Sequence, residues 1–192
     1  MSETCYSVAV YQDRVYAATF TSDTTPYAQV YIYGSGGKEE LSFRVATEGF
    51  VTLSVKNNQI KCCLFYEAKI EVYSLRGELL RTHSTYNGDD ARQLTCQYIS
   101  DDDRDGNVLI VDKGNSRLQV MSEQGEFSVL QLQPPVSHPR SAVLFNNQLY
   151  VTTHKSAEVS KYVFMKFWQV GRSIIKHAKD YSSLNCMPQS AY

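Results

Sequence analysis

Short runs of apolar and β-branched residues, separated by turn-forming residues, recur along this chain of 192 residues. Residues 107–127 show the pattern clearly: NVLIV is followed by DKGNSR, and then LQVM is followed by SEQG. Apolar runs of about four to eight residues between such turn signals are typical of β-strands. The pattern predicts two short antiparallel strands in this segment, with a turn on either side.

The same unit occurs four times. When Val15, Ile60, Val108 and Leu149 are taken as equivalent, the repeats are separated by 45, 48 and 41 residues. Each unit has an apolar run, a turn, two further strand-like runs and a glycine-bearing turn before a fourth run, although the last unit has no clear fourth run. A period of about 40–50 residues made of short strands predicts β-propeller blades rather than helical repeats. We therefore expect an all-β, β-propeller-like array of about four four-stranded blades, the last incomplete, over residues 1–166.

One segment resembles a known family. Asp112-Lys-Gly-Asn-Ser-Arg-Leu118, between NVLIV and QVMSEQGEF, resembles an NHL repeat, the propeller repeat found at the C-terminus of some tripartite-motif (TRIM) ubiquitin ligases. The motif is convincing over residues 106–127, and the analogy of fold covers about residues 4–165. The resemblance implies a module that recruits protein substrates to a ubiquitin ligase or binds single-stranded RNA. The cysteine and histidine zinc modules of the ligase parts are absent from this sequence.

Four units are fewer than the six blades usual in NHL domains. Three alternatives follow: a compact four-blade closure, a fragment of a larger protein, or an arc completed by another chain. An open arc leaves unpaired edges, so self-association through open sheet edges is one expectation. After residue 166 the pattern changes, and Trp168, Ile175 and Ala178 predict a short amphipathic helix followed by a flexible tail within residues 167–192.

The residues of the NHL-like motif have a structural interpretation. Asp112 and Asn115 are expected to bond the backbone across a tight turn in which Gly114 takes a positive φ. Arg117 is expected to donate to loop carbonyls or to an aspartate of an adjacent blade. The functional alternative places Lys113 and Arg117 at a rim that faces a ligand.

An acidic segment just before the motif resembles the start of a calcium-binding loop. Asp101, Asp103 and Asp105 have the D-x-D-x-D-G spacing, and Asp112 stands at the twelfth position. A strand over 107–111 would carry Asp112 roughly 20 Å away from the other acids, because a strand rises about 3.3 Å per residue. We expect a solvated hairpin turn and no cofactor, with a weak calcium site at Asp101, Asp103 and Asp105 as the alternative.

Catalytic motifs are absent from the sequence. The four histidines have no metal-binding spacing, and neither G-x-S-x-G nor a phosphate-binding G-x-x-x-x-G-K occurs. These observations predict that the chain is not an enzyme. The alternative is a metal-dependent propeller hydrolase or lyase, whose catalytic group would come from several blades.

Composition adds three expectations. The net charge of −1 gives no attraction to DNA or to an anionic membrane, and it favours a protein partner over RNA, for which Tyr66 and Tyr86 near Lys69 and Arg81 are the hint. The sequence contains neither a signal-peptide pattern nor about 18 consecutive apolar residues, so we expect a cytoplasmic protein. The five cysteines lack zinc-ligand spacing and are expected to be reduced thiols.

Charge also differs between the two predicted faces. The turns between first and second and between third and fourth strands are mainly acidic. The opposite face carries scattered basic groups, and we expect the non-catalytic protein-interaction surface there. The predicted partner-binding residues are Lys69, Arg81, Arg92, Lys113, Arg117, Arg140, His154 and Lys155.

Overall fold

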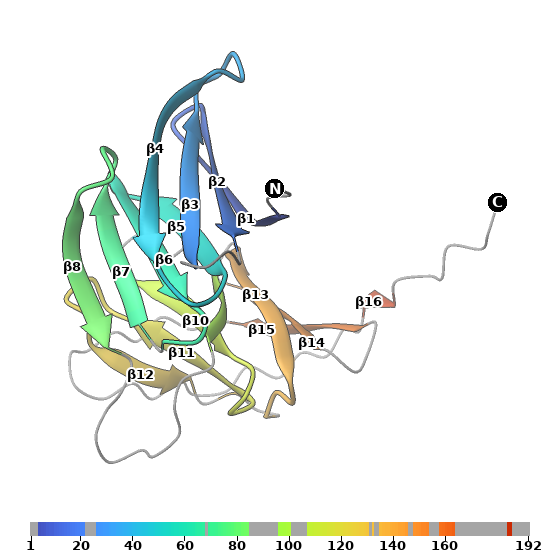
Figure 1. Ribbon diagram of the computed structural model, residues 1–192. Helices are drawn as coiled ribbons and strands as arrows, with labels where there is room; N and C mark the ends of the chain where they lie inside the picture. Colours follow the sequence, from blue (N-terminus) through green and yellow to red (C-terminus); the bar gives the residue numbers. More distant parts are fainter. Residues whose placement is uncertain are drawn as a thin grey trace.

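The chain folds into four antiparallel sheets of four strands, each made of consecutive strands (Figure 1). This is a computed structural model, and it describes residues 4–21, 26–67, 69–84, 96–100, 107–130, 132, 135–145, 148–153, 158–163 and 184–185. Helices are absent from these described parts. The predicted all-β class and the four four-stranded repeats are confirmed. We number the sheets blade 1 to blade 4 in chain order.

Each blade has four strands in the same order along the chain. Blade 1 contains β1 (Thr4–Tyr11), β2 (Arg14–Thr21), β3 (Tyr27–Tyr33) and β4 (Glu39–Ala46). Blade 2 contains β5 (Val51–Lys56), β6 (Gln59–Leu64), β7 (Lys69–Ser74) and β8 (Leu79–Ser84). Blade 3 contains β9 (Cys96–Ser100), β10 (Val108–Asp112), β11 (Arg117–Met121) and β12 (Phe127–Leu130). Blade 4 contains β13 (Pro139–Phe145), β14 (Gln148–Thr153), β15 (Glu158–Val163) and β16 (Leu184–Asn185).

Two-residue turns join the first two strands of blades 1 and 2. Gln12 and Asp13 have φ values of 49° and 59°, and Asn57 and Asn58 have 50° and 59°. Two consecutive residues with positive φ match the right-handed twist of the strands that they connect. Asparagine and aspartate tolerate this conformation better than most residues, so the sequence itself encodes these hairpins.

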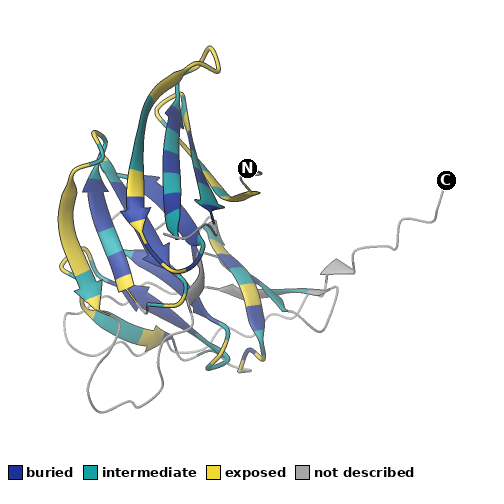
Figure 2. Cartoon of the chain, viewed as in Figure 1, coloured by how far each residue is buried: buried dark blue, intermediate teal, exposed yellow. Residues whose placement is uncertain are grey.

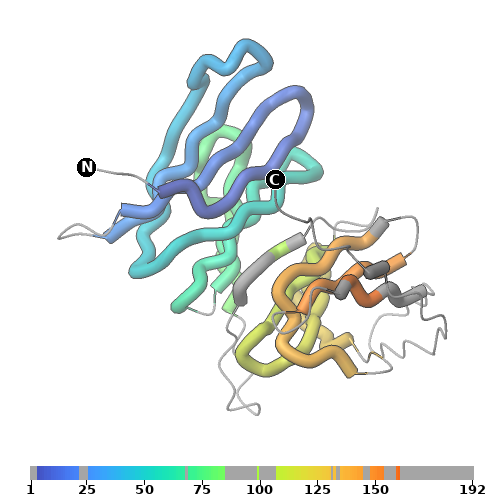
Figure 3. The backbone as a smooth tube through the Cα atoms, turned by 90° about the vertical axis from the view of Figure 1, so that its right-hand side faces the viewer, coloured from blue at the N-terminus to red at the C-terminus, as the bar shows by residue number. Residues whose placement is uncertain are grey.

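The first strands of the blades pack against one another in chain order. β1 contacts β5, β5 contacts β9, and β9 contacts β13, whereas the fourth strand of each blade lies at the far edge of its sheet. Figure 3 shows blades 1 and 2 side by side, with blades 3 and 4 side by side next to them. Consecutive blades therefore face each other across their sheets.

Apolar side chains between consecutive blades form three cores. Tyr16 and Val30 of blade 1 meet Leu53 and Ile60 of blade 2, and further clusters join blade 2 to blade 3 and blade 3 to blade 4. Strands β5, β6 and β10 are mostly buried, whereas the outer strand β8 is mostly exposed (Figure 2). Each buried aliphatic side chain contributes about 1.5–3 kcal/mol, so packing between blades holds the array together.

Cys62 and Cys63 point to opposite faces of β6, as their adjacent positions predict. Cys62 is a buried free thiol in the core between blades 1 and 2, and burial raises its pKa. Cys63 faces the core between blades 2 and 3 and is disulfide-bonded. The expectation of reduced thiols was therefore wrong for Cys63, because the sequence does not reveal which distant cysteine the fold brings to it.

The predicted C-terminal helix within residues 167–192 lies outside the described residues, with two exceptions. Leu184 and Asn185 form β16, which pairs with Val159 and Glu158 of β15. This short strand is the fourth strand that the sequence of the last repeat did not show. Within the described parts of the chain, no helix is long and apolar enough to cross a membrane.

Candidate binding surface at the junction of blades 1 and 2

Four aromatic side chains gather where blade 1 meets blade 2, and we call them the aromatic cluster. Tyr6 lies in β1, Phe50 directly precedes β5, and Phe65 and Tyr66 follow β6. The Tyr6 and Phe50 rings stack with centroids 5.1 Å apart, and Phe50 stacks on Phe65 at 4.3 Å. Tyr66 meets the edge of Phe65 at 4.8 Å. The cluster joins the connection between the two blades to the β6–β7 turn.

The backbone around Gly49 allows this packing. A Cβ atom at Gly49 would overlap the Tyr66 ring, so only glycine lets the ring approach so closely. The amide of Gly49 donates to Thr47 Oγ1 at 3.1 Å, and the amide of Phe65 donates to the Phe50 carbonyl at 3.3 Å. The first bond stabilises the turn that leads to Phe50, and the second joins Phe65 to Phe50 and so holds the two connections together.

Half of the cluster faces solvent. Tyr66 is 60% exposed and Tyr6 is 49% exposed, whereas Phe50 and Phe65 are half-buried beneath them. Aromatic rings of this kind offer an apolar face to side chains, proline rings or bases, and they attract cations to that face. The surface is therefore a platform rather than an enclosed pocket.

Charged groups beside the platform are mainly acidic. Lys69 Nζ lies 3.8 Å from Glu67 Oε2, and Glu67 Oε1 accepts a hydrogen bond of 3.0 Å from the Glu48 amide. Glu67 thus offsets the charge of Lys69 and also fixes the connection that carries Phe50. Glu48 is exposed and lies two residues before Phe50, so it adds a second acidic group to the connection that carries this ring.

The predicted partner-binding residues lie in different parts of the structure. Lys69 adjoins the aromatic cluster, and Arg81 on the outer strand β8 donates to Gln59 Oε1 at 3.2 Å. Lys113 and Arg117 belong to the β10–β11 turn of blade 3, and Arg140 is exposed on β13. Residues outside the described parts of the chain are Arg92, His154 and Lys155, and the proposed calcium ligands Asp101, Asp103 and Asp105.

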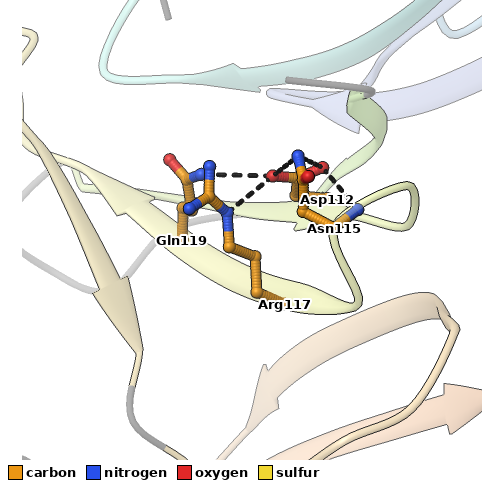
Figure 4. Close-up of polar contacts among 4 residues, drawn as sticks. All are labelled: Asp112, Asn115, Arg117 and Gln119. Carbon is orange, nitrogen blue, oxygen red and sulfur yellow. Dashed lines mark hydrogen bonds and ion pairs between the residues drawn. The ribbon is translucent and has the colours of Figure 1, made fainter. Parts of the chain in front are cut away.

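Asp112 forms the centre of a buried polar network in blade 3 (Figure 4). Its carboxylate is fully buried and accepts hydrogen bonds from Asn115 Nδ2 at 3.0 and 2.9 Å, from Arg117 Nε at 2.8 Å and from Gln119 Nε2 at 3.3 Å. The Arg117 side chain is only 19% exposed. This geometry supports the structural interpretation of the motif, in which these side chains hold the β10–β11 hairpin together.

One detail of that interpretation was wrong. Ser116, with a φ of 50°, takes the left-handed conformation that was expected of Gly114. Arg117 donates to Asp112 of its own blade, because the register places these two residues opposite each other. The strand expected before Asp112 is present as β10, as the argument against an EF-hand required.

The contact between blades 2 and 3 includes a histidine in an unusual environment. His83 of β8 packs against Gly125 in the β11–β12 turn, and its Nε2 is buried with no hydrogen-bond partner among the described residues. Burial lowers the pKa of His83, and the positive charges of Arg81 and Lys61 lower it further. The folded chain therefore favours neutral His83.

Stability is expected to fall as the pH drops below the ordinary histidine pKa of about 6.5. Below that value the unfolded chain binds a proton at His83 that the folded chain resists, so the proton favours unfolding. In His83→Gln the loss of stability between about pH 7.5 and about pH 5.5 should be smaller, measured as the change in urea midpoint. An equal loss in both proteins would show that His83 does not contribute. At about pH 8, where both side chains are neutral, any difference reports packing alone.

The aromatic cluster was missed by the sequence reasoning, which named only Tyr66 of these four residues, as part of a hint of RNA binding. A signal was present: Phe50 and Phe65 flank β5 and β6 at the same end of blade 2, and Tyr6 lies at that end of blade 1. Recognising it requires the relative placement of two blades. Single-repeat patterns do not contain that information.

Comparisons with known proteins identify the fold. Neither a protein family model nor a curated protein matches the sequence. Among solved structures, a streptogramin B lyase superposes with a TM-score of 0.65 at 16% identity, covering 83% of this chain and 51% of the other. The β-propeller domain of Cps50 (Swd1) from Myceliophteria thermophila gives 0.62 at 10% identity, covering 85% and 52%. The chain has a β-propeller fold.

A third similar structure bears on catalysis. The glutaminyl cyclase of Myxococcus xanthus superposes with a TM-score of 0.57 at 14% identity, covering 83% of this chain and 65% of the other. The prediction that the chain is not an enzyme is contradicted, because propellers that share this arrangement of blades include a lyase and a cyclase. The propeller fold is compatible with catalysis. The chain spans about half the length of the first two propellers.

Proposed function

We propose that this chain is a polypeptide-binding propeller module of the NHL type and that the aromatic cluster is its binding surface. One observation carries the proposal: Tyr66 and Tyr6 expose 60% and 49% of their surface while their rings pack on Phe50 and Phe65. Exposed aromatic groups on a rigid base are characteristic of protein-binding sites, because large rings bury much apolar area at little cost in side-chain entropy.

The charges near the cluster favour a polypeptide over RNA. RNA-binding platforms place cations next to the aromatic rings, where they contact phosphates. Here Glu67 offsets Lys69, and Glu48 contributes a further negative charge. A ligand with an apolar or aromatic anchor and a nearby lysine or arginine matches this surface, since its cation would meet both the carboxylates and the Tyr66 ring.

The resemblance of residues 106–127 to an NHL repeat supports a narrower role. Such modules recruit substrate proteins to ubiquitin ligases, and the polypeptide bound here would then be a ligase substrate. The Asp112 network supports this resemblance at the level of the repeat, because the motif residues that carry it contact one another.

Replacing Tyr66 with alanine is expected to weaken binding of selected peptides about 30-fold or more, since loss of a central aromatic anchor typically costs about 2 kcal/mol or more. The peptides would be selected from a displayed random library on the immobilised wild-type chain and their affinities measured by fluorescence anisotropy. Leu80→Ala is the matched control, because Leu80 is 48% exposed on the outer strand β8.

Two results would contradict the proposal. One is a set of selected peptides that bind Tyr66→Ala and wild type equally well. The other is binding of oligouridine RNA that weakens steeply with added salt and is lost in Tyr66→Ala, because that dependence is the signature of phosphate contacts.

A further inference from the structure

The outer face of blade 1 exposes residues whose equivalents are buried in the other blades. Val15 is 39% exposed, whereas the equivalent Ile60, Val108 and Leu149 are fully buried against the preceding blade. The difference continues along the first strand. Val8 is 59% exposed, whereas its equivalent in blade 2, Leu53, is 5% exposed. Val10 is 67% exposed, whereas its equivalent, Val55, is 2% exposed. The face carries the kind of apolar residues that form contacts between blades. Among the described residues, however, no blade packs against it.

The turns between third and fourth strands show the same difference. Gly77 of blade 2 and Gly125 of blade 3 both have a positive φ, and each amide donates to the residue three positions earlier, at 3.0 and 2.9 Å. A Cβ on Gly77 would overlap Phe43 of blade 1, and a Cβ on Gly125 would overlap His83 of blade 2. In both cases a ring from the outer strand of the preceding blade packs on the turn glycine.

Gly37 occupies the same position in blade 1. Its φ is 73°, and its amide donates to the Gly34 carbonyl at 2.9 Å, as in the other two turns. A Cβ at Gly37 would meet nothing within 4 Å. The turn is built to receive a side chain from a preceding blade, and none of the described residues supplies one.

The far face of blade 4 has the complementary composition. Val143 on this face is 50% exposed, and Tyr150 is half-buried where its equivalent in blade 1, Tyr16, is fully buried against the next blade. In the outer strand, Leu184 pairs with Val159. That register position is the one held by Phe43 opposite Val30 and by His83 opposite Ile70.

We propose that the occupant of these two faces is a second copy of this chain. Blade 4 of each copy packs on blade 1 of the other, so two head-to-tail contacts close a ring of eight blades. Propellers typically have about four to eight blades. Head-to-tail contacts form a closed ring, with no open ends, when the rotation from one copy to the next completes a circle. This chain covers 51% of the streptogramin B lyase and 52% of the Cps50 domain, so two copies supply about the length of one such propeller.

The repeat also predicts a specific hydrogen bond across the new contact. Ser7 Oγ of blade 1 accepts from the Leu53 amide of blade 2 at 2.9 Å. Ser141 occupies the position of Ser7 in blade 4, since each follows a register shift and pairs with the equivalent residue of the second strand. Val8 is the equivalent of Leu53. We expect Ser141 Oγ of one copy to accept from the Val8 amide of the other.

The solution mass of the full chain, measured by size-exclusion chromatography with light scattering, tests the proposal. The wild type is expected at twice the 21.8 kDa of one chain. Val10→Lys blocks the face of blade 1, and Val143→Glu blocks the face of blade 4, so each variant alone should run at the mass of one chain. Leu80→Lys is the control, because Leu80 is exposed on blade 2, and this variant should keep twice the mass.

Mixing the two blocked variants distinguishes head-to-tail pairing from other arrangements. An equimolar mixture of Val10→Lys and Val143→Glu has one native contact and one contact between a lysine and a glutamate, and it should recover twice the mass. This recovery also shows that both variants are folded; Val8→Lys replaces Val10→Lys if the far-ultraviolet circular dichroism of Val10→Lys is altered. A wild-type chain at the mass of one chain, or a mixture that stays at that mass, overturns the proposal.

Discussion

Replacing Asp112 with alanine is expected to lower the free energy of unfolding by about 3–5 kcal/mol, the usual result of removing one partner of a buried ion pair. The Asp112 carboxylate is fully buried and accepts from three side chains. Its removal takes away the carboxylate that lies 2.8 Å from the Arg117 guanidinium, a charged group that is only 19% exposed. Buried donors without acceptors carry the full cost of their lost hydration. Urea denaturation followed by circular dichroism measures the effect.

A double variant distinguishes the effect of losing the whole ion pair from the effect of removing Asp112 while Arg117 remains charged. Asp112→Ala combined with Arg117→Met removes both charges, and it should be less destabilising than Asp112→Ala alone, because replacing a whole buried ion pair by apolar groups is often nearly neutral. Glu123→Ala is the matched control, since Glu123 is exposed in the β11–β12 turn of the same blade and should change stability by less than about 0.5 kcal/mol. If Asp112→Ala behaves like Glu123→Ala, the network does not hold the blade.

The sequence alone predicts the blades well because their determinants are local. Alternation of apolar residues and two-residue turns such as Asn57–Asn58 specify each hairpin within about 20 residues. The period of Val15, Ile60, Val108 and Leu149 then sets the number of sheets, and the structure places all four at the start of a second strand. Even the strand before Asp112, which argued against an EF-hand, follows from this local pattern.

The remaining features depend on contacts between repeats. The aromatic cluster needs Tyr6 of blade 1 beside Phe50 and Phe65 of blade 2, and the distance along the chain gives no sign of that contact. The fourth strand of blade 4 begins at Leu184, more than 20 residues after β15 ends, so no turn signal adjoins it. The left-handed residue of the motif was assigned to Gly114 on intrinsic preference, whereas the hairpin places Ser116 there.

Replacing Gly125 with alanine is expected to destabilise the chain by about 2–5 kcal/mol, because two independent costs add. The φ of 91° is unfavourable for any residue with a Cβ, which contributes about 1–2 kcal/mol. The new methyl group would also overlap the His83 ring of blade 2, and overpacking of this kind costs about 1–3 kcal/mol. Combining Gly125→Ala with His83→Ala should remove the second cost but keep the first. Thermal or urea unfolding measures both.

Two glycines of blade 1 distinguish the cost of the backbone conformation from the cost of overpacking. The comparison uses a background in which self-association does not contribute. In the Val10→Lys background, Gly36→Ala should change stability by less than about 0.5 kcal/mol, because Gly36 has open space around it and no positive φ. Gly37→Ala should cost only the about 1–2 kcal/mol of its backbone conformation. In the wild-type background, Gly37→Ala should in addition weaken the association of two copies, since a methyl group there meets the incoming blade as it does at Gly77 and Gly125. If Gly37→Ala leaves the dimer unchanged, nothing covers Gly37. If Gly125→Ala lowers stability no more than Gly37→Ala does, the His83 ring moves aside without strain.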